Sequence, residues 1–219
     1  MNEEHQSATS ALPLPTIRRY PIYLRCIKEM IAAGELHISS AVVAERLGLD
    51  PVLTRKDLAM SGVIGKPRRG YPAQELQDAI NHALGWDSTT DAILVGVGSL
   101  GNALLGYSGF EEQNLSICAA FDAHPGTIGR TFHGVKVRPM EDLQRIVRQL
   151  GVKIGILTVP SAAAQACAEQ LVAAGIRGIW NFTSVQLDVP KGVVVQSVDL
   201  AQSLAVLSHS IVQGAEPVA

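Results

Sequence analysis

The 219-residue chain has little cysteine and no long hydrophobic run. Its three cysteines, Cys26, Cys118 and Cys167, are widely separated and form neither a CxxC pair nor a cysteine–histidine pattern, so we expect ordinary buried thiols and no metal site. No apolar run approaches the roughly 20 residues that span a bilayer. The polar first ten residues have the pattern of neither a signal peptide nor a transit peptide. We therefore expect a cytoplasmic protein without a membrane partner.

Charge is distributed unevenly along the chain. Residues 16–72 contain ten Lys or Arg and only five Asp or Glu, a net charge of +5. Because the whole chain carries −2, the remaining residues together carry −7. A basic first third joined to an acidic remainder indicates two modules with different partners, a polyanion being the obvious partner of the first. Solvated surface charge is the plainer alternative.

The basic module has the pattern of a winged helix-turn-helix. Asp50-Pro51 is a strong helix start, a capping side chain followed by proline at the first helical position. The glycine-bounded basic segment 62–71 predicts a short hairpin, which is the wing. We expect a disordered start (1–15), a DNA-binding domain (16–84) and a linker (85–90). Helices are predicted over residues 16–33, 40–47, 51–61 and 73–84.

From Asp91 the pattern changes to apolar runs of strand length that alternate with helical stretches. Runs that are apolar on both faces indicate a parallel sheet covered on both sides, so residues 91–199 predict an α/β, doubly wound Rossmann domain. Residues 200–213 predict a last helix that is apolar over much of its circumference and needs a core or a partner. Predicted strands cover residues 92–97, 117–121, 154–159 and 193–195, and predicted helices 100–107, 141–149 and 162–174.

Residues 93–101 read Ile-Leu-Val-Gly-Val-Gly-Ser-Leu-Gly, a GxGxxG motif between a predicted strand and a predicted helix. In this motif Gly96 allows the tight turn, Gly98 lets the backbone approach a pyrophosphate, and Gly101 permits close helix–strand packing. The second predicted strand ends in Asp122, 21 residues after Gly101. A carboxylate there accepts hydrogen bonds from ribose hydroxyls and repels a 2′-phosphate. The combination predicts a dinucleotide site, for NAD(H) rather than NADP(H).

Two later turns complete the predicted site. Ligands of such sheets bind at the carboxyl ends of the strands, where Thr158–Pro160 and Asn181-Phe182 are expected. A plain helix start is the alternative role of Pro160. The predicted cofactor-binding residues are Gly96, Gly98, Ser99, Leu100, Gly101, Asp122, Thr158, Val159, Pro160, Asn181 and Phe182.

The chain shows no pattern for hydride-transfer chemistry. A dehydrogenase moves a proton with a His–Asp pair, a Tyr–Lys pair or a lysine. There is no Tyr-x-x-x-Lys, and His124, His133 and His209 are isolated in the sequence. Fewer than 100 residues follow Asp122, and completing the sheet uses them. Binding without turnover is the better interpretation, and we predict no catalytic residue.

Basic residues fall where a winged helix contacts DNA. The start of the third predicted helix enters the major groove, and the wing reaches the backbone or the minor groove. A solvated basic face on a small dimerisation module is the alternative. The predicted DNA-binding residues are Thr54, Arg55, Lys56, Lys66, Arg68 and Arg69.

In their order and spacing, these motifs resemble those of the redox-sensing transcriptional repressor family Rex over essentially residues 17–212. The strings that carry the resemblance are Tyr23-Leu-Arg25, Val43-Ala-Glu-Arg-Leu47, Arg55-Lys-Asp-Leu58, Gly96-Val-Gly-Ser-Leu-Gly101, Tyr107-x-Gly109-Phe110, Phe121-Asp122, Leu157-Thr-Val-Pro160, Asn181-Phe182 and Val198-Asp199.

The resemblance implies a homodimer that binds operator DNA with NAD+ or without cofactor and releases it when NADH binds. It also implies a switch in which Arg25 pairs with Asp199 in the DNA-binding state and Tyr107 takes that aspartate when NADH is bound. The terminal helix of the family is exchanged between subunits. Two alternatives stay open: a small NAD-dependent oxidoreductase with a helical appendage, and a CoA- or nucleotide-binding regulator on the same sheet.

Overall fold

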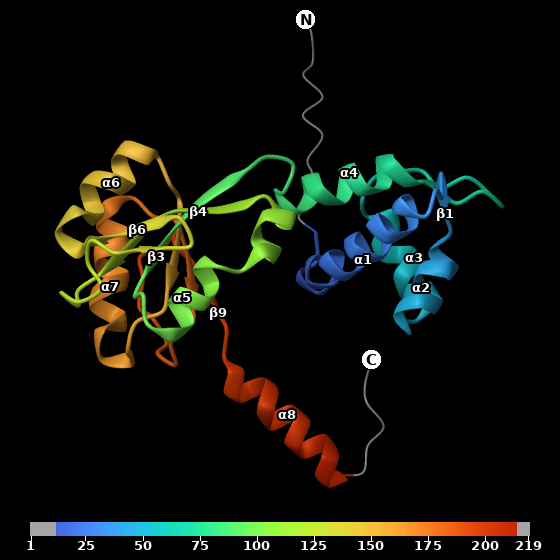
Figure 1. Ribbon diagram of the computed structural model, residues 1–219. Helices are drawn as coiled ribbons and strands as arrows, with labels where there is room; N and C mark the ends of the chain where they lie inside the picture. Colours follow the sequence, from blue (N-terminus) through green and yellow to red (C-terminus); the bar gives the residue numbers. More distant parts are fainter. Residues whose placement is uncertain (1–11, 214–219) are drawn as a thin grey trace, which may run out of the picture. The chain divides into compact units, whose positions relative to one another are not determined.

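The computed structural model describes residues 12–213, which divide into two compact units between Ser88 and Thr89 (Figure 1). Residues 1–11, most of the segment expected to be disordered, lie outside the described residues. The first helix begins at Leu14, two residues before the predicted domain start. Pro15 stands in its first turn, where a missing N–H costs no hydrogen bond.

The first unit contains four helices around an apolar core. Capping side chains set two helix starts, since Ser39 accepts from the Ala41 N–H and Asp50 accepts from the Leu53 N–H at 2.7 Å. The elements are α1 (Leu14–Ala32), β1 (His37–Ile38), α2 (Ser40–Leu47), α3 (Pro51–Ala59), β2 (Tyr71–Pro72) and α4 (Ala73–Leu84). The core includes Tyr20, Tyr23, Ile27, Ile38, Leu58, Leu76 and Ile80.

The wing is a tighter structure than the predicted hairpin. Lys66 and Gly70 exchange backbone hydrogen bonds of 2.8 and 2.9 Å around a short turn. The residues after this turn, β2, pair with β1 instead of with the first arm of the wing. Gly70 has φ +84, and a Cβ there would collide with the carbonyl oxygen of Ile38. Because β2, the second arm of the wing, pairs with β1, the two arms of the wing share only the bridge between Lys66 and Gly70.

The second unit is a seven-stranded sheet with strand order β5-β6-β4-β3-β7-β8-β9. All neighbouring strands are parallel except β5 and β6, which are antiparallel. Without β5, the spatial order β6-β4-β3-β7-β8-β9 is that of a doubly wound dinucleotide-binding sheet. The strands are β3 (Thr90–Val95), β4 (Leu115–Asp122), β5 (Thr131–Phe132), β6 (Val135–Pro139), β7 (Ile154–Leu157), β8 (Gly178–Asn181) and β9 (Val194–Ser197). The helices are α5 (Ser99–Leu105), η1 (Ser108–Gln113), η2 (Met140–Asp142), α6 (Leu143–Leu150), α7 (Ser161–Ala174) and α8 (Leu200–Gln213).

Alternate side chains of the central strands pack on opposite faces of the sheet. Ile93 and Phe121 contribute to the core beneath α6 and α7, whereas Leu94 and Ala120 belong to the core beneath α5 (Figure 1). Burial on both faces explains the continuous apolar runs of the sequence. The predicted fold class, an N-terminal winged helix-turn-helix followed by a doubly wound α/β sheet, is confirmed.

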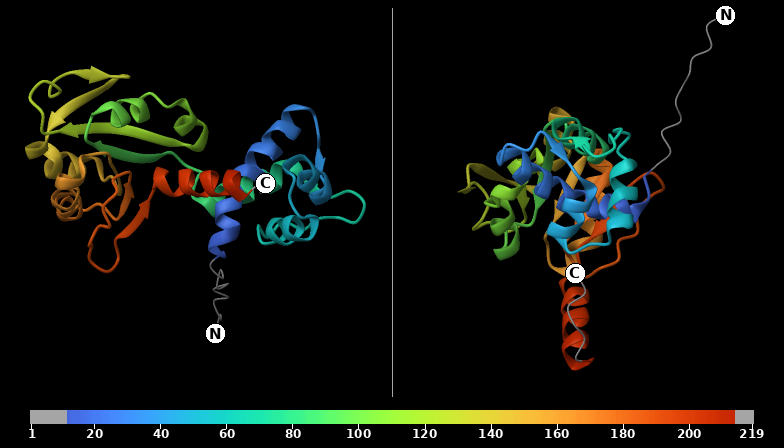
Figure 2. Two further views of the ribbon diagram at one scale, coloured as in Figure 1. Left: turned by 90° about the horizontal axis from the view of Figure 1, so that it is seen from below. Right: turned by 90° about the vertical axis from the view of Figure 1, so that its right-hand side faces the viewer.

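Strands β5, β6 and β8 lie outside the predicted strands. Strands β5 and β6 form a hairpin at the edge of the sheet (Figure 2). Its turn residues His133 and Gly134 both have positive φ, 48° and 83°, as a tight two-residue hairpin requires. Strand β6 alternates apolar and charged residues, so it lacks the continuous apolar run that marks the central strands β3, β4 and β7. In residues 12–213, no helix is both long and apolar enough to cross a membrane.

Candidate functional site

The glycine turn after β3 is shaped by contact with the end of β7. Gly96 has φ +98, and a Cβ on it would lie 2.7 Å from the Thr158 carbonyl oxygen. A Cβ on Gly101 would collide with the carbonyl oxygen of Gly96. A Cβ on Gly98, in contrast, would meet no atom within 4 Å. Packing therefore requires two of the three glycines, while Gly98 leaves its side of the turn open to a ligand.

Asp122 ends β4 beside this turn. Its Oδ2 accepts a 2.7 Å hydrogen bond from the Val97 N–H, and its Oδ1 accepts a 2.8 Å bond from the His124 N–H. Each carboxylate oxygen keeps further acceptor capacity, because it has more than one lone-pair site. The carboxylate is thus held in one orientation by the backbone and can still accept from ribose hydroxyls.

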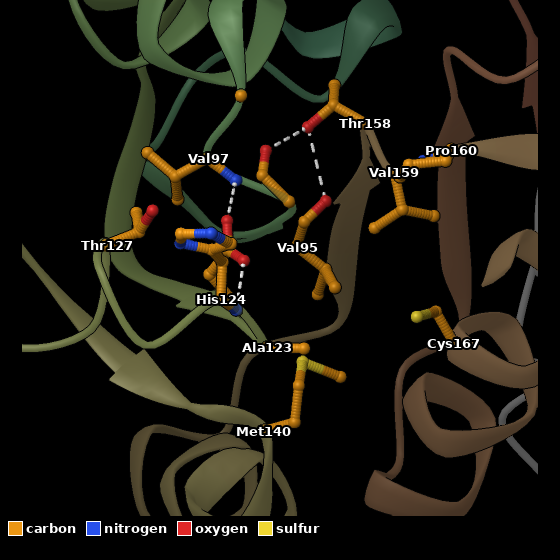
Figure 3. A pocket seen from close by; sticks show the side chains of 13 residues that line it. Val95, Val97, Ala123, His124, Thr127, Met140, Thr158, Val159, Pro160 and Cys167 are labelled. Atoms are coloured by element: carbon orange, nitrogen blue, oxygen red, sulfur yellow. Dashed lines mark hydrogen bonds between the residues drawn. The ribbon is translucent and has the colours of Figure 1, made fainter.

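Thr158 secures the turn from the other side. Its hydroxyl lies 2.6 Å from the Gly96 carbonyl oxygen and 3.2 Å from that of Val95, and it donates its proton to this pair (Figure 3). The glycine turn is therefore fixed between the ends of β4 and β7, as expected for the switch point of a doubly wound sheet.

These elements surround a cavity of about 540 Å³ (Figure 3). A volume of this size lies in the range of small-molecule and cofactor sites. Six of the eleven predicted cofactor residues line it: Gly96, Gly98, Asp122, Thr158, Val159 and Pro160.

The other five predicted cofactor residues do not line the cavity. Ser99 and Leu100 are exposed at the start of α5, directly after Gly98, and Gly101 is buried under the turn. Asn181 is completely buried, and its amide donates to the Val185 carbonyl while its oxygen accepts from Thr183. It shapes the loop after β8. The ring of Phe182 lies against Trp180, with centroids 5.0 Å apart. For all five, cofactor contact stays a prediction.

Seven lining residues lie outside the predicted set: Val95, Val97, Ala123, His124, Thr127, Met140 and Cys167. Met140 follows the unpredicted strand β6, and Cys167 comes from the middle of α7, so no motif announces them. His124 accepts the Gly126 N–H on Nδ1 at 3.1 Å, which places the ring proton of the neutral form on Nε2. Burial raises the pKa of the Cys167 thiol, and the charge of Asp122 raises it further.

The predicted DNA-binding residues are exposed, with one exception. Arg55 and Lys56 lie on the surface of α3, and Lys66, Arg68 and Arg69 lie on the surface of the wing. Thr54 is completely buried, which corrects its prediction as a surface residue. The reason is helix geometry: Thr54 and Leu58 are four residues apart, so they share the face of α3 that packs into the core.

Asp57, also on α3, is a buried charged residue that the sequence motifs leave without a role. Its carboxylate accepts hydrogen bonds from Arg19 Nε (2.6 Å) and Nη2 (2.9 Å), Thr16 Oγ1 (2.9 Å) and Tyr23 OH (2.8 Å). The Tyr20 hydroxyl donates to its backbone carbonyl at 3.2 Å. Burial alone raises the pKa of this carboxyl, but the bonds from Arg19, Tyr23 and Thr16 outweigh it and hold the pKa below its ordinary value.

The three predicted switch residues are exposed. Arg25 lies on α1, in the first unit. Tyr107 lies between α5 and η1 with its ring edge-on to Phe110, centroids 5.0 Å apart. Asp199 accepts a 2.8 Å hydrogen bond from the Ala201 N–H and so caps α8. Their exchange of partners stays a prediction. In the part of the chain that the structure describes, no three His, Cys, Asp or Glu side chains gather as metal ligands would.

Two family models match the chain. Residues 87–185 match the model described as "CoA binding domain", and residues 11–59 match "Putative DNA-binding protein N-terminus". Curated relatives extend over nearly the whole chain. A protein of Treponema denticola named redox-sensing transcriptional repressor Rex is 46% identical over 88% of this chain and 92% of its own length. A protein of the same name from Carboxydothermus hydrogenoformans is 40% identical over 91% and 96%.

Solved structures agree with the curated relatives. RSP in complex with β-NAD+ and operator DNA superposes with a TM-score of 0.87 at 33% identity, covering 94% of both chains. RSP in complex with β-NADH superposes with a TM-score of 0.82 at 32% identity, covering 94% of this chain and 96% of that one. The identity of the curated relatives, their coverage of both modules and the geometry of the glycine turn agree: the chain belongs to the Rex family of redox-sensing transcriptional repressors.

Proposed function

We propose that this chain is a DNA-binding repressor that senses the ratio of NADH to NAD+. It binds double-stranded operator DNA with NAD+ or without cofactor, and NADH releases it. The observation that carries the proposal is the bond between the Asp122 carboxylate and the Val97 N–H, which joins the ribose acid to the glycine turn at the rim of the cavity. RSP, a family member, was crystallised both with β-NAD+ and operator DNA and with β-NADH.

The adenosine end of the cavity favours NAD(H) over NADP(H). Asp122 presents a carboxylate that two backbone N–H groups hold in place, so it accepts from a 2′-hydroxyl and repels a 2′-phosphate. No arginine or lysine is among the residues that line the cavity. A 2′-phosphate therefore finds a fixed negative charge and no cation in the cavity lining.

The same cavity supports a signalling role for the cofactor over a catalytic one. Its titratable lining residues are Asp122, His124 and Cys167. Asp122 ends β4 and is itself the ribose acid, and His124, two residues later, lies at the same adenosine end, too close to that acid to serve hydride transfer. The Cys167 thiol is held protonated by its raised pKa. We propose that NAD(H) is bound and released unchanged, as fits a family of proteins named repressors.

The DNA-binding part of the proposal rests on the exposed cations of α3 and the wing. Arg55 and Lys56 are exposed in the middle of α3, the helix that by its place in a winged helix-turn-helix meets base edges and phosphates. The cations of the wing are held by a closed turn, in which Arg68 adopts a left-handed conformation with φ 61. Since duplex DNA and the dinucleotide pool are both cytoplasmic in a bacterial cell, we propose that the protein acts there.

The active form is proposed to be a homodimer joined by α8. Five large apolar side chains of this helix are exposed: Leu204, Val206, Leu207, Ile211 and Val212. Large apolar side chains exposed over much of one helix mark an interaction surface. A second copy that exchanges the helix would bury it. In that dimer, Arg25, Tyr107 and Asp199 are proposed as the switch. Sedimentation of the full chain tests this assembly, and a monomer at micromolar concentration contradicts it.

The deciding experiment is a gel shift on a duplex from the promoter of the protein's own gene, with NAD+ and NADH titrated. We expect retention with NAD+ and release with NADH. Calorimetry with NADH, NADPH, ATP and CoA separates the two alternative functions, a small NAD-dependent oxidoreductase and a CoA- or nucleotide-binding regulator. Turnover of NADH without DNA affinity would establish an oxidoreductase, and CoA binding in place of NADH a CoA-dependent regulator.

A further inference from the structure

In the first unit, α3 is joined to α1 by hydrogen bonds to a buried residue. The backbone of α1 lies close to α4 and α2, and α3 lies close to α2. The hydrogen bonds from α1 to α3 converge on one residue of α3, Asp57. Four residues of α1 donate to it: Thr16, Arg19, Tyr20 and Tyr23.

The four donors occupy one face of α1, because they are spaced i, i+3, i+4 and i+7. Asp57 is 2% exposed, so its bonds are made away from water. The planar guanidinium of Arg19 contacts both carboxylate oxygens, which fixes orientation as well as distance. An arrangement of this kind restrains α3 from rolling or sliding along α1.

Arg55 and Lys56 immediately precede Asp57 in α3. At 100° per residue, Arg55 lies about 200° around the helix from Asp57, and Lys56 about 100°. Arg55 and Lys56 are exposed and Asp57 is buried, in agreement with this geometry. Any rotation of α3 that Asp57 allows is therefore transferred directly to the two cations that meet DNA.

We infer that Asp57 is a positioning residue for DNA recognition: its bonds to α1 set the rotation of α3 that presents Arg55 and Lys56 to the duplex. This rests on the proposed DNA-binding function and deepens it. It also implies that α1 and α3 move together. A displacement of α1 at Arg25, on its exposed side, would therefore also displace α3 and its DNA-binding residues.

The test compares three variants of the full chain on a labelled duplex from the promoter of its own gene. Asp57→Asn keeps the volume but turns one acceptor into a donor that faces other donors. Tyr23→Phe removes one bond and keeps the ring in the core. Leu76→Ala, in the same apolar core on α4, is the structural control. NADH affinity, which belongs to the second unit, reports that each protein is folded there.

We expect Asp57→Asn to weaken duplex binding at least about 10-fold well below its unfolding temperature, and Tyr23→Phe to weaken it about 3-fold. The slope of log K against log salt should fall by about 0.9 for each DNA phosphate that the variant no longer neutralises, a change that partial unfolding does not produce. Leu76→Ala should lower the unfolding temperature as much as Asp57→Asn does. It should nevertheless keep the wild-type duplex affinity and the wild-type salt slope.

Wild-type affinity and slope in the folded Asp57→Asn and Tyr23→Phe proteins would overturn the inference. Equally weakened binding, without a change of slope, in Asp57→Asn and Leu76→Ala would overturn it too. If Asp57→Asn does not fold, the Tyr23→Phe affinity and slope decide. Failure of the wild type to bind any promoter duplex would instead reject the proposed function.

Discussion

The Asp122 carboxylate accepts a 2.7 Å hydrogen bond from the backbone N–H of Val97, 25 residues earlier in the chain. One bond therefore links the end of β4 to the turn that follows β3. The acid that would bind the ribose and the turn that would bind the pyrophosphate are held at a fixed spacing. Changing either partner should disturb both halves of the dinucleotide site.

Replacing Asp122 with alanine should weaken NADH binding by roughly 10- to 100-fold, the scale of removing a hydrogen bond to a charged group. The protein should then stay on its operator at NADH concentrations that release the wild type. Calorimetry and NADH-titrated gel shifts measure the two effects. Asp122→Asn, which keeps one acceptor, should be intermediate. Unchanged NADH affinity in Asp122→Ala would exclude the ribose role.

The glycines of the turn provide a matched pair of substitutions. Gly96→Ala places a Cβ 2.7 Å from the Thr158 carbonyl oxygen at φ +98, so it should destabilise the second unit by about 2 kcal/mol or more. Gly98→Ala meets no atom within 4 Å at an ordinary φ of −78°, so it should fold normally and still lose NADH affinity. Thermal unfolding and calorimetry separate the two. A Gly98→Ala protein that binds NADH normally would show that no ligand approaches there.

Arg55→Ala should weaken operator binding by about 1 to 3 kcal/mol and leave NADH affinity unchanged, since the side chain is exposed on α3, in the first unit. The control is Arg145→Ala, the same chemical change at an exposed arginine that pairs with Asp142 in the second unit. Fluorescence anisotropy with a labelled duplex measures both. Equal affinity of the two variants would count against a role for α3 in binding DNA.

Tyr107→Phe should blunt NADH-induced release more than NADH binding. The Tyr107 ring packs edge-on against Phe110, which phenylalanine preserves, so the change removes only the exposed hydroxyl. Release is measured as the NADH concentration that halves duplex binding, and binding by calorimetry without DNA. A proportional change in both would argue against a switch role for this hydroxyl.

The first unit should lose stability at both ends of the pH scale. The pKa of Asp57 is lowered in the folded state, so its contribution is present above its ordinary pKa and is lost as pH falls through the folded value. Burial raises the pKa of Tyr20 to about 12 from its ordinary 10, so that contribution is present below pH 10 and is lost as pH rises toward 12.

Tryptophan fluorescence can follow this unit by itself. The chain has two tryptophans, and Trp86 packs against the core of the first unit. In a Trp180→Phe background, urea unfolding of the Trp86 signal between pH 3 and 11 should show both losses. Adding Tyr20→Phe should flatten the alkaline limb and leave the acid limb, and an unchanged alkaline limb would exclude Tyr20 as its source.

Local patterns predicted much of this molecule. Continuous apolar runs predict buried parallel strands because both faces of this sheet are covered, and Gly96 and Gly101 are required by the close packing of the turn after β3. The hairpin β5–β6 was not predicted, because β6 alternates and its turn uses His133-Gly134 instead of a common turn pair.

The sequence by itself determined the order of the two modules, the glycine turn with its acid at Asp122, and the family. Only the tertiary structure decided which side chains meet. It buries Thr54, engages Asn181 in its own loop, and brings Cys167 from α7 to the cavity. It also encloses Asp57 among donors from α1, 34 to 41 residues away. Such interactions depend on how helices pack, and no local spacing records the face that a distant helix will cover.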